Sequence, residues 1–415
     1  MRQLLLGLFV VISCLGTFAA GQAPGGATVF QGARVIVGDG RVIENGAFIV
    51  NGGRITWAGT LGDAKIPQGT ARVDLSGKTV IPALIDTHTH LSATREGLVT
   101  DLQRRAYYGV GVAVSLGQDA GDLPFQVRDE VIPGAARFRT AGRGLSAPEP
   151  GRSEVPYWVT TEEQARKAVQ ELGARKVDLV KIWVDDRGGK YMKLSPALSR
   201  AIIEEAHTHG LRVTAHIFTL EDAKGLLRSG VDAFAHGIRD RDIDDEVVGL
   251  FKQRPNVVVV PNLPDRGVKT DLSWLRDSVS AGEFQKLQAA AATDRPEAQA
   301  TFGIQARNLA RLAKEGVRIG LGTDGNTPWG AHLEMADMVA TGMTPAQVLV
   351  AATRNSAELL RMTDVGTIEA GKSADFVVLD ANPLQDITNT RRINAVYLRG
   401  ASVDRAALRA KFAAP

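Results

Sequence analysis

The chain has 415 residues, of which 44% are hydrophobic and 23% charged, with 44 glycines and 17 prolines. This composition excludes a disordered, a collagen-like or a coiled-coil protein, and the length fits one large domain with a smaller companion. The 49 basic and 46 acidic residues leave a formal net charge of +3 without a long Lys/Arg block, so the charge gives no footprint for nucleic-acid binding.

Residues 1–23 predict an export signal. Arg2 precedes an apolar stretch over residues 4–15, and small residues follow up to Ala23, which is the pattern of a secretory signal peptide. The stretch is shorter than the about 20 residues of a membrane span, so we expect a periplasmic or extracellular protein without a stable membrane span. The alternative is a lipoprotein signal with Cys14 lipidated. Cys14 is the only cysteine, which excludes a disulfide framework and Cys-based zinc sites.

Short strand-like runs near both ends of the chain predict one small β domain. The runs cover residues 28–37, 47–50, 54–57, 374–379 and 393–398. Asn51-Gly52-Gly53 predicts a hairpin turn, because Asn and Gly accept the positive φ that such turns need. Two β segments that bracket a long middle predict a composite β-sandwich domain, built from residues 24–79 and 365–415.

The middle of the chain, residues 80–364, alternates apolar runs with amphipathic segments. The apolar runs cover residues 80–86, 110–116, 137–142, 177–184, 211–217, 231–236, 257–261 and 317–323, and the clearest helices are predicted over 195–209, 220–229 and 240–253. Eight apolar strands over this length predict an α/β fold, the (β/α)8 TIM barrel. The competing interpretation is a doubly wound open sheet, but no G-x-G-x-x-G follows the first strand.

Six residues with metal-ligating or acid–base chemistry fall at or near the ends of these strands. They are His88 and His90 after the first, Lys181 within the fourth, His216 and His236 at the fifth and sixth, and Asp324 after the eighth. Residues two apart on a strand face the same side, and barrel enzymes carry their chemistry at the carboxyl ends of the strands. The six residues therefore predict a metal site.

A second histidine pair, His207 and His209, has the same spacing but lies on a predicted helix. Positions two apart on a helix point about 200° away from each other, so this pair predicts surface histidines and no shared metal.

The motif Val80 to His90, Val-Ile-Pro-Ala-Leu-Ile-Asp-Thr-His-Thr-His, resembles the first-strand motif of the metal-dependent amidohydrolase superfamily. The resemblance continues in order over residues 28–400, and it is closest to imidazolonepropionase-like and Xaa-Pro dipeptidase-like members. Residues 366–379 resemble the tail of the composite β domain of that superfamily. Ala83 and Gly325 depart from the family pattern, where Gly and Ala are usual, but neither position is a ligand.

The resemblance implies that the six side chains hold two divalent ions, with Zn²⁺ as the expected metal. The set is His88, His90 and Asp324 on a buried ion, His216 and His236 on a second, and Lys181 between the two. The lysine would be carboxylated by CO2, because an ammonium group cannot ligate a cation whereas a carbamate offers two anionic oxygens. Nitrogen and oxygen ligands of this kind suit Zn²⁺, and Mn²⁺, Co²⁺ or Fe²⁺ would also fit.

We interpret this set as the site of a hydrolase acting on a carbon–nitrogen amide bond of a small molecule. A hydroxide that bridges the ions would attack the carbonyl, and Asp324 would move the proton to the leaving group. The expected substrate is an Xaa-Pro-like dipeptide or an N-acyl amino acid, with a cyclic amide, an imine or a lactone as the alternative. The alternative to an enzyme is a non-catalytic periplasmic barrel that binds a metal or ligand. Binding alone, however, would not require both Lys181 and Asp324.

The loops after the strands are expected to set substrate specificity. Candidate contacts for a substrate carboxylate are Arg143, Tyr157, Arg187 and Arg239, with Asn262 and His332 as further polar contacts. For the arginines and Tyr157 the role of an ordinary surface residue is favoured over substrate binding, and His332 is as well suited to organising its loop as to touching substrate. Residues 270–313 predict a helical excursion or lid. The sequence leaves the oligomeric state open, a homo-oligomer included.

Overall fold

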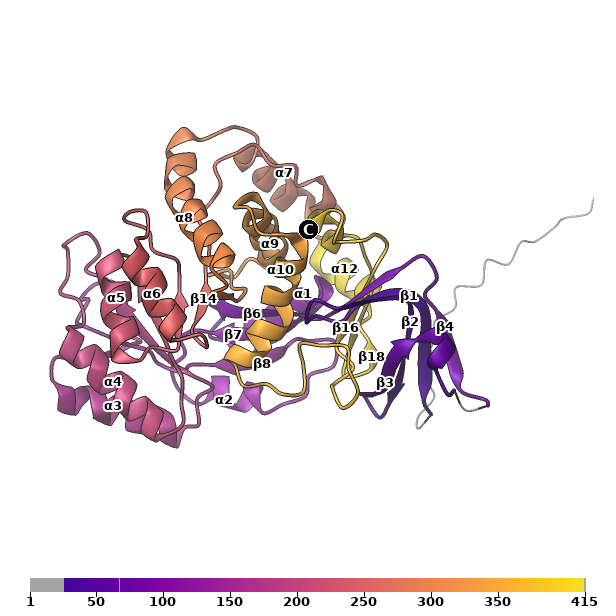
Figure 1. Cartoon of the computed structure of the whole chain (residues 1–415), viewed down its shortest axis with the longest axis horizontal. Coiled ribbons are helices and arrows are strands. Elements are labelled where there is room, and N and C mark those ends of the chain that lie inside the picture. Colours follow the sequence, from indigo (N-terminus) through magenta and orange to yellow (C-terminus); the bar gives the residue numbers. More distant parts are fainter. Residues whose placement is uncertain (1–25, 67, 414–415) are drawn as a thin grey trace, which may run out of the picture.

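The computed structural model describes residues 26–66 and 68–413. The predicted export signal and Cys14 lie outside these residues. The described chain forms a barrel and a smaller β domain side by side, shown in Figure 1 with the β domain on the right. Among the described helices, none combines the length with the apolar character that crossing a membrane requires.

Eight parallel strands form the barrel. They are β6 (Leu84–Thr89), β7 (Val110–Ser115), β8 (Arg137–Thr140), β11 (Val180–Val184), β12 (Val213–Ile217), β13 (Ala233–Ala235), β14 (Val258–Val260) and β15 (Arg318–Ile319). The strands pair in two groups, β6 to β8 and β11 to β15. Backbone bonds close both gaps: Asp178 N donates to Thr140 O at 3.0 Å and Thr87 N to Leu321 O at 2.9 Å.

Each predicted apolar run overlaps one barrel strand, so the predicted fold class is confirmed. The first run is divided, however, because its early residues belong to β5 (Thr79–Pro82), which pairs in the β domain. The barrel strand begins only at Leu84, after the chain has passed from one part to the other.

Helices cover the outside of the barrel. They are α1 (Arg95–Tyr107), α2 (Leu123–Arg128), α3 (Glu162–Ala174), α4 (Pro196–Thr208), α5 (Leu220–Ser229), α6 (Asp245–Gln253), α7 (Ala281–Ala290), α8 (Pro296–Lys314), α9 (Gly330–Ala340), α10 (Pro345–Val350), the π-helix η3 (Ala351–Asn355) and α11 (Ser356–Leu359). The predicted helices α4 and α5 are present. The third, α6, begins later than expected because the Asp244 side chain caps it by accepting from Val247 N. The predicted excursion is α7 and α8, at the top of Figure 1.

The β domain is one mixed sheet assembled from both ends of the described chain. Its strands are β1 (Thr28–Ile36), β2 (Val42–Asn51), β3 (Arg54–Thr60), β4 (Ala71–Asp74), β5, β16 (Phe376–Leu379), β17 (Ile393–Leu398) and β18 (Ala401–Ser402). The predicted hairpin joins β2 to β3, with φ of 57° at Gly52 and 75° at Gly53. Four aromatic rings from β1, β2, β16 and β17 form the core, with neighbouring ring centroids 4.6–5.1 Å apart: Phe30, Phe48, Phe376 and Tyr397.

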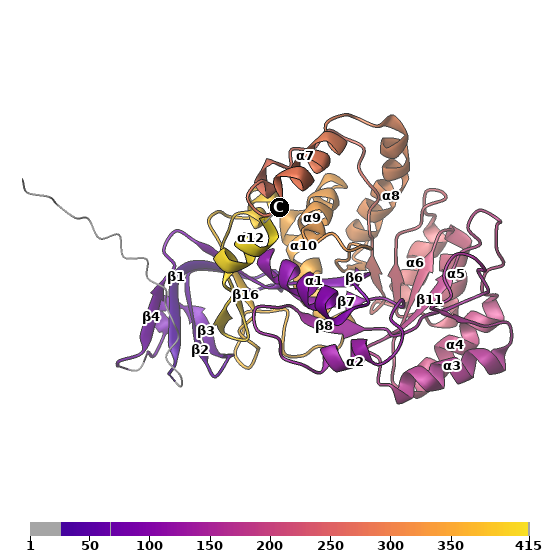
Figure 2. The same ribbon diagram turned by 180° about the vertical axis from the view of Figure 1, so that it is seen from behind.

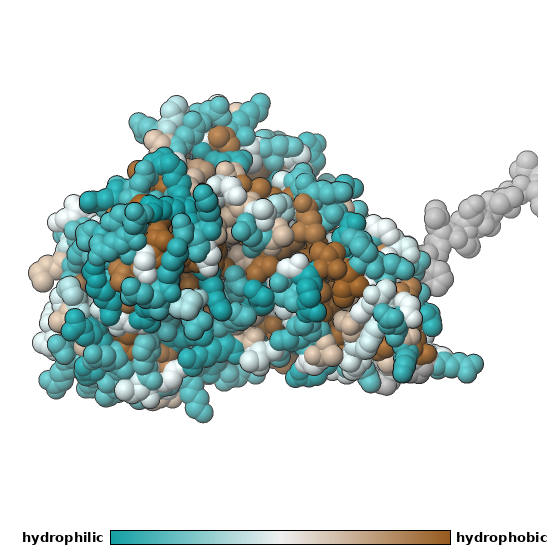
Figure 3. Space-filling model, viewed as in Figure 1, coloured by the Kyte–Doolittle hydropathy of each residue, from teal (hydrophilic) through white to brown (hydrophobic). Residues whose placement is uncertain are grey.

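The C-terminal helix α12 (Arg405–Ala413) returns from this β domain to the barrel and lies near α1, as Figure 2 shows. Its Phe412 is buried, with the Tyr107 ring 6.4 Å away and the Arg104 guanidinium 5.1 Å away. In Figure 3 the surface over α3 to α6 is largely hydrophilic, while hydrophobic atoms gather in a band between the barrel and the β domain.

Replacing Phe376 by alanine tests the aromatic core. This ring is fully buried and contacts rings from three other strands, so we expect Phe376→Ala to lower the free energy of unfolding by about 3–5 kcal/mol. Urea unfolding measures the change, with Val131→Ala, a 74% exposed position, as the control that shifts it by less than about 0.5 kcal/mol. A loss below about 1 kcal/mol would contradict this core.

Candidate metal centre and active site

Strained backbone marks the carboxyl end of the barrel. In the described part of the chain, eight non-glycine residues have a positive φ. Four of them follow barrel strands: Arg187 at 57°, His236 at 104°, Asn262 at 44° and Asp324 at 50°. Non-glycine residues avoid this region unless their surroundings hold them there, and such strain gathers at functional sites.

Three predicted ligands meet at the seam between β6 and β15. The Nε2 atoms of His88 and His90 each lie 3.0 Å from Asp324 Oδ1, and one ligand atom from each residue lies within 4.8 Å of the others. The backbone brings Asp324 there, because its N–H donates to the His88 carbonyl at 2.8 Å. This group can hold one metal ion.

Asp86 fixes the same seam from beneath. Its buried carboxylate accepts from His88 N at 3.2 Å, from Thr323 N at 3.1 Å and from Thr323 Oγ1 at 2.8 Å. Burial raises its pKa to about 6, against the opposing effects of the Arg105 charge and these hydrogen bonds. Asp86 was not among the predicted site residues, although a carboxylate inside an apolar run was a signal that could have identified it.

The remaining ligand candidates adjoin this group. The His88 and His236 rings lie 5.3 Å apart and the His236 and His216 rings 4.5 Å apart, between centroids. His236 Nε2 lies 3.5 Å from Asp324 Oδ2. Lys181 is wholly buried on β11, where it pairs with Thr214 of β12, two residues before His216.

Hydrogen bonds to neighbouring side chains determine which ring nitrogen of His88 and of His216 carries the proton. His88 Nδ1 lies 2.9 Å from the Asn262 Oδ1 acceptor, so Nδ1 carries the proton and Nε2 keeps a free lone pair. His216 Nε2 lies 2.9 Å from Asp185 Oδ2, which leaves Nδ1 free in the same way. Asp185 was missed in the sequence analysis, because its role depends on the pairing of β11 with β12.

Burial sets the charges of the site. It lowers the pKa of His88 to about 4 and that of His216 to about 3, and the nearby Lys181 charge lowers both further. Burial also lowers the pKa of Lys181 to about 7. Burial would raise the pKa of Asp324, but its interactions with the His88 and His90 rings hold that pKa far below its usual value. Near neutral pH His88 and His216 are therefore neutral and Asp324 is ionised, which are the metal-binding forms.

Several buried polar atoms at this site have no hydrogen-bond partner. They are Lys181 Nζ, His90 Nδ1 and His236 Nε2. Buried polar groups are almost always paired, so this concentration calls for a missing ligand. Nitrogen and carboxylate donors are ligands that divalent transition metals accept, and the residues fit such an ion.

A model of the amidohydrolase family matches residues 152–403, which is more than half of the chain. The chain belongs to the amidohydrolase family. It is therefore a hydrolase of the metal-dependent amidohydrolase superfamily, and its barrel with an attached β domain is the amidohydrolase fold.

Similar proteins differ in the reactions that their names give. The imidazolonepropionase of Deinococcus radiodurans is 27% identical over 95% of this chain and 99% of its own. A prolidase candidate from Bifidobacterium longum is 26% identical, with a TM-score of 0.75 over 94% of this chain and 99% of its own. An Xaa-Pro dipeptidase with bound methionine, 21% identical, shares the fold with a TM-score of 0.72 over 91% and 99% of the two chains.

The predicted substrate-binding residues of this amidohydrolase fall into two groups, one beside the metal centre and one within a loop. Arg187 Nη1 and Arg239 Nη2 each lie 3.0 Å from His216 Nε2, beside the metal centre. Arg143 donates to the Val155 carbonyl, and its guanidinium lies 4.0 Å from the centroid of the Tyr157 ring. Arg143 and Tyr157 are thus engaged with their own loop, and a contact with substrate stays a prediction for them.

In the structure His332 has the organising role that its sequence left open beside a contact with substrate. This histidine is buried on α9, with Nε2 2.9 Å from the Tyr108 carbonyl oxygen and Nδ1 3.0 Å from Thr390 Oγ1. Both ring nitrogens are therefore occupied in the interior, where they join three separate segments. The helical pair behaves as predicted: His207 and His209 are exposed, and they contact Asp232 and Glu205.

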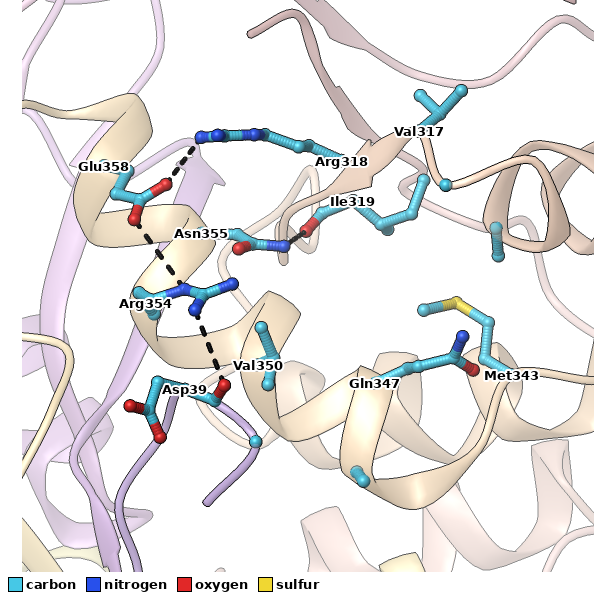
Figure 4. Close-up of a pocket in the computed structure, with 14 residues that line it drawn as sticks. Asp39, Val317, Arg318, Ile319, Met343, Gln347, Val350, Arg354, Asn355 and Glu358 are labelled. Carbon is cyan, nitrogen blue, oxygen red and sulfur yellow. Dashed lines mark hydrogen bonds and ion pairs between the residues drawn. The ribbon is translucent and has the colours of Figure 1, made fainter. Parts of the chain in front are cut away.

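Two cavities lie at opposite ends of the barrel. One of about 290 Å³ is lined by Leu263, Leu333, Glu334 and the Thr323 that precedes Asp324, so it adjoins the metal centre. A larger one of about 560 Å³, shown in Figure 4, lies at the start of β15. Its polar groups pair with one another, as in the 2.6 Å Arg318–Glu358 ion pair. Of these two cavities, only the smaller one is lined by a residue next to a metal-ligand candidate, Thr323 beside Asp324.

His332 predicts a pH dependence of stability. Burial lowers its pKa to about 4, below the about 6.5 of an unfolded chain. The unfolded state takes up the proton first as the pH falls, so this residue removes about 2 kcal/mol from the free energy of unfolding between pH 7 and pH 5. In urea unfolding at both pH values, His332→Gln should show a correspondingly smaller loss than the wild type, while the exposed control His209→Gln should keep the wild-type loss. An equal loss in His332→Gln and wild type would contradict the assignment.

Proposed function

We propose that this amidohydrolase cleaves the amide bond of a small molecule with a carboxylate, an Xaa-Pro-like dipeptide or an N-acyl amino acid. The observation that carries the proposal is the convergence of His88, His90, His216, His236, Asp324 and the partnerless Lys181 at the barrel mouth. The similarity in fold to an Xaa-Pro dipeptidase supports this substrate class.

A second candidate is the hydrolysis of a cyclic amide or imine. It is favoured by the 27% identity with imidazolonepropionase over nearly the full length of both chains. The two candidates share the metal centre and differ in whether the bond to be cleaved lies in a ring.

Two divalent ions, which we propose to be zinc, would be held by the six residues in two groups. His88, His90 and Asp324 would hold one, and His216 and His236 the other, with a carboxylated Lys181 shared between them. When bound, such ions supply a water of lowered pKa and polarise a carbonyl.

The chain itself supplies the proton transfer and the bridging group. A carboxylate of Asp324, ionised at neutral pH, accepts the proton of the attacking water and returns it to the leaving nitrogen. Lys181 lies where burial favours the neutral amine. That amine adds to CO2 through a new N–C bond and releases one proton, which leaves an anionic carbamate.

Asn262 and Asp185 keep the proton of each histidine on the nitrogen that faces away from the ligand position. We also propose that residues 1–23 direct the enzyme out of the cytoplasm, so its substrate would be met in the periplasm or outside the cell.

Substrate panels test the function. For the zinc-loaded enzyme we expect release of free amino acid from dipeptides and N-acetyl amino acids, with slower or no opening of cyclic amides and lactones. Asp324→Asn should lower kcat by about 100-fold or more, because proton transfer by a positioned carboxylate contributes on that scale. Turnover of cyclic substrates alone would support the second candidate, and near-normal turnover by Asp324→Asn with retained metal would reject the proton-transfer role.

Bicarbonate dependence tests the bridging lysine. Chain stripped of metal and CO2 should take up zinc fully only when bicarbonate is added, and ¹³C-bicarbonate should give a carbamate resonance in the NMR spectrum. Lys181→Met should lose both properties. Lys190→Met, an exposed lysine in the loop after the same strand, is the matched control and should keep both. Zinc uptake that is independent of bicarbonate in the wild type would contradict carboxylation.

A further inference from the structure

Arg239 is a cation at the metal centre without an anion of its own. It follows His236 by three residues, and its Nη2 donates to the Ile217 carbonyl at 2.6 Å. Its Nε is buried without a hydrogen-bond partner. Among the described residues, no carboxylate oxygen lies within the 4.0 Å of an ion pair with this guanidinium. An unpaired, largely buried charge is costly, so the position calls for an anionic ligand.

Arg187 stands on the other side of the same imidazole. Its Nη1 and Arg239 Nη2 are both 3.0 Å from His216 Nε2, so the two guanidinium groups lie close together. Arg187 is anchored by Asp185 at 2.8 Å and by Glu149 at 3.1 Å, but its Nη2 is buried and unpartnered. Both arginines therefore keep an unused N–H donor beside the metal ligand.

The local carboxylates do not balance this charge. Asp185 binds Arg187 and accepts from His216, while Glu149 is shared between Arg187 and Arg152, 2.7 Å away. Arg239 receives only longer-range attraction from Asp185 and Asp324. The two guanidinium groups thus leave a net positive edge on the site.

We infer that Arg239, together with the free Nη2 of Arg187, binds the α-carboxylate of the amino acid that leaves in the reaction. This inference rests on the proposed function and identifies the part of the substrate that is recognised. In an N-acyl amino acid the carboxyl carbon lies about 2.5 Å from the amide nitrogen, so its receptor must adjoin the metal ligands. Arg239 does, through His216. A guanidinium group also matches a carboxylate with two parallel N–H donors.

Phe218 indicates the side chain that accompanies this carboxylate. The Arg239 guanidinium lies 5.0 Å from the centroid of its ring, and Phe218 is 42% exposed, one of four exposed large hydrophobic residues in the described chain. An apolar ring beside this charged group favours a leaving amino acid with an apolar side chain, proline included.

Paired probes that the proposed reaction does not consume test the inference. Isothermal titration of the zinc-loaded enzyme would compare the twenty free amino acids, which are products of the proposed reaction, with the corresponding amino acid amides, which lack the carboxylate charge. For the apolar members we expect the acid to bind about 10- to 100-fold more tightly than the amide. Arg239→Gln should abolish this ratio, Arg239→Lys should restore part of it, and Arg241→Gln, an exposed arginine two residues further on, should leave it unchanged.

The ratio of acid affinity to amide affinity shows whether Arg239 binds the carboxylate or only supports the local structure. If Arg239 only positioned His216, its loss would weaken acids and amides equally and lower the zinc content. That result, or a panel in which no acid binds more tightly than its amide, would overturn the inference. A normal acid preference, together with no hydrolysis of any compound in the substrate panels, would reject the proposed function and retain the carboxylate receptor.

Discussion

The site depends on one buried carboxylate at the seam where the barrel closes. Asp86 accepts three hydrogen bonds, from His88 N and from both donors of Thr323, and so joins the end of β6 to the residues after β15. Two ligand candidates, His88 and Asp324, flank these anchor points. Their side chains come from positions more than 200 residues apart, and this seam sets their 3.0 Å separation. Burying the Asp86 carboxylate is unfavourable, as its raised pKa indicates, and its hydrogen bonds offset part of that unfavourable free energy.

The same burial prepares the other residues for metal chemistry. It keeps His88 and His216 neutral, and it brings the Lys181 amine toward its uncharged form. Asp185 and Asn262 then direct the free lone pairs by holding the proton of each imidazole on the opposite nitrogen. Positive φ at His236 and Asp324 turns the chain at the strand ends. Burial, hydrogen bonds from neighbouring side chains and backbone strain thus together set the charge and the orientation of the ligand candidates.

The architecture was predictable because periodicity and turn residues are local signals. Eight apolar runs predicted the eight barrel strands, and Asn51-Gly52-Gly53 predicted the hairpin between β2 and β3. The placement of His88, His90, His216, His236, Lys181 and Asp324 at strand ends was equally readable. Contacts between residues that lie far apart in the sequence could not be predicted. Asp185 reaches His216 only because β11 pairs with β12. His332 contacts Tyr108 and Thr390, which lie 224 and 58 positions away in the sequence. Arg143 and Tyr157 likewise meet each other within one loop. No single-residue pattern carries such contacts.

Metal stoichiometry shows whether side chains from five strands together hold a metal pair. The full chain, purified in the presence of zinc and bicarbonate, should contain two zinc ions per chain by plasma mass spectrometry. The double variant His216→Asn with His236→Asn should retain one, and His207→Asn with His209→Asn should retain both. Absence of stoichiometric zinc in the wild type, or equal zinc in the wild type and the His216/His236 variant, would contradict the account.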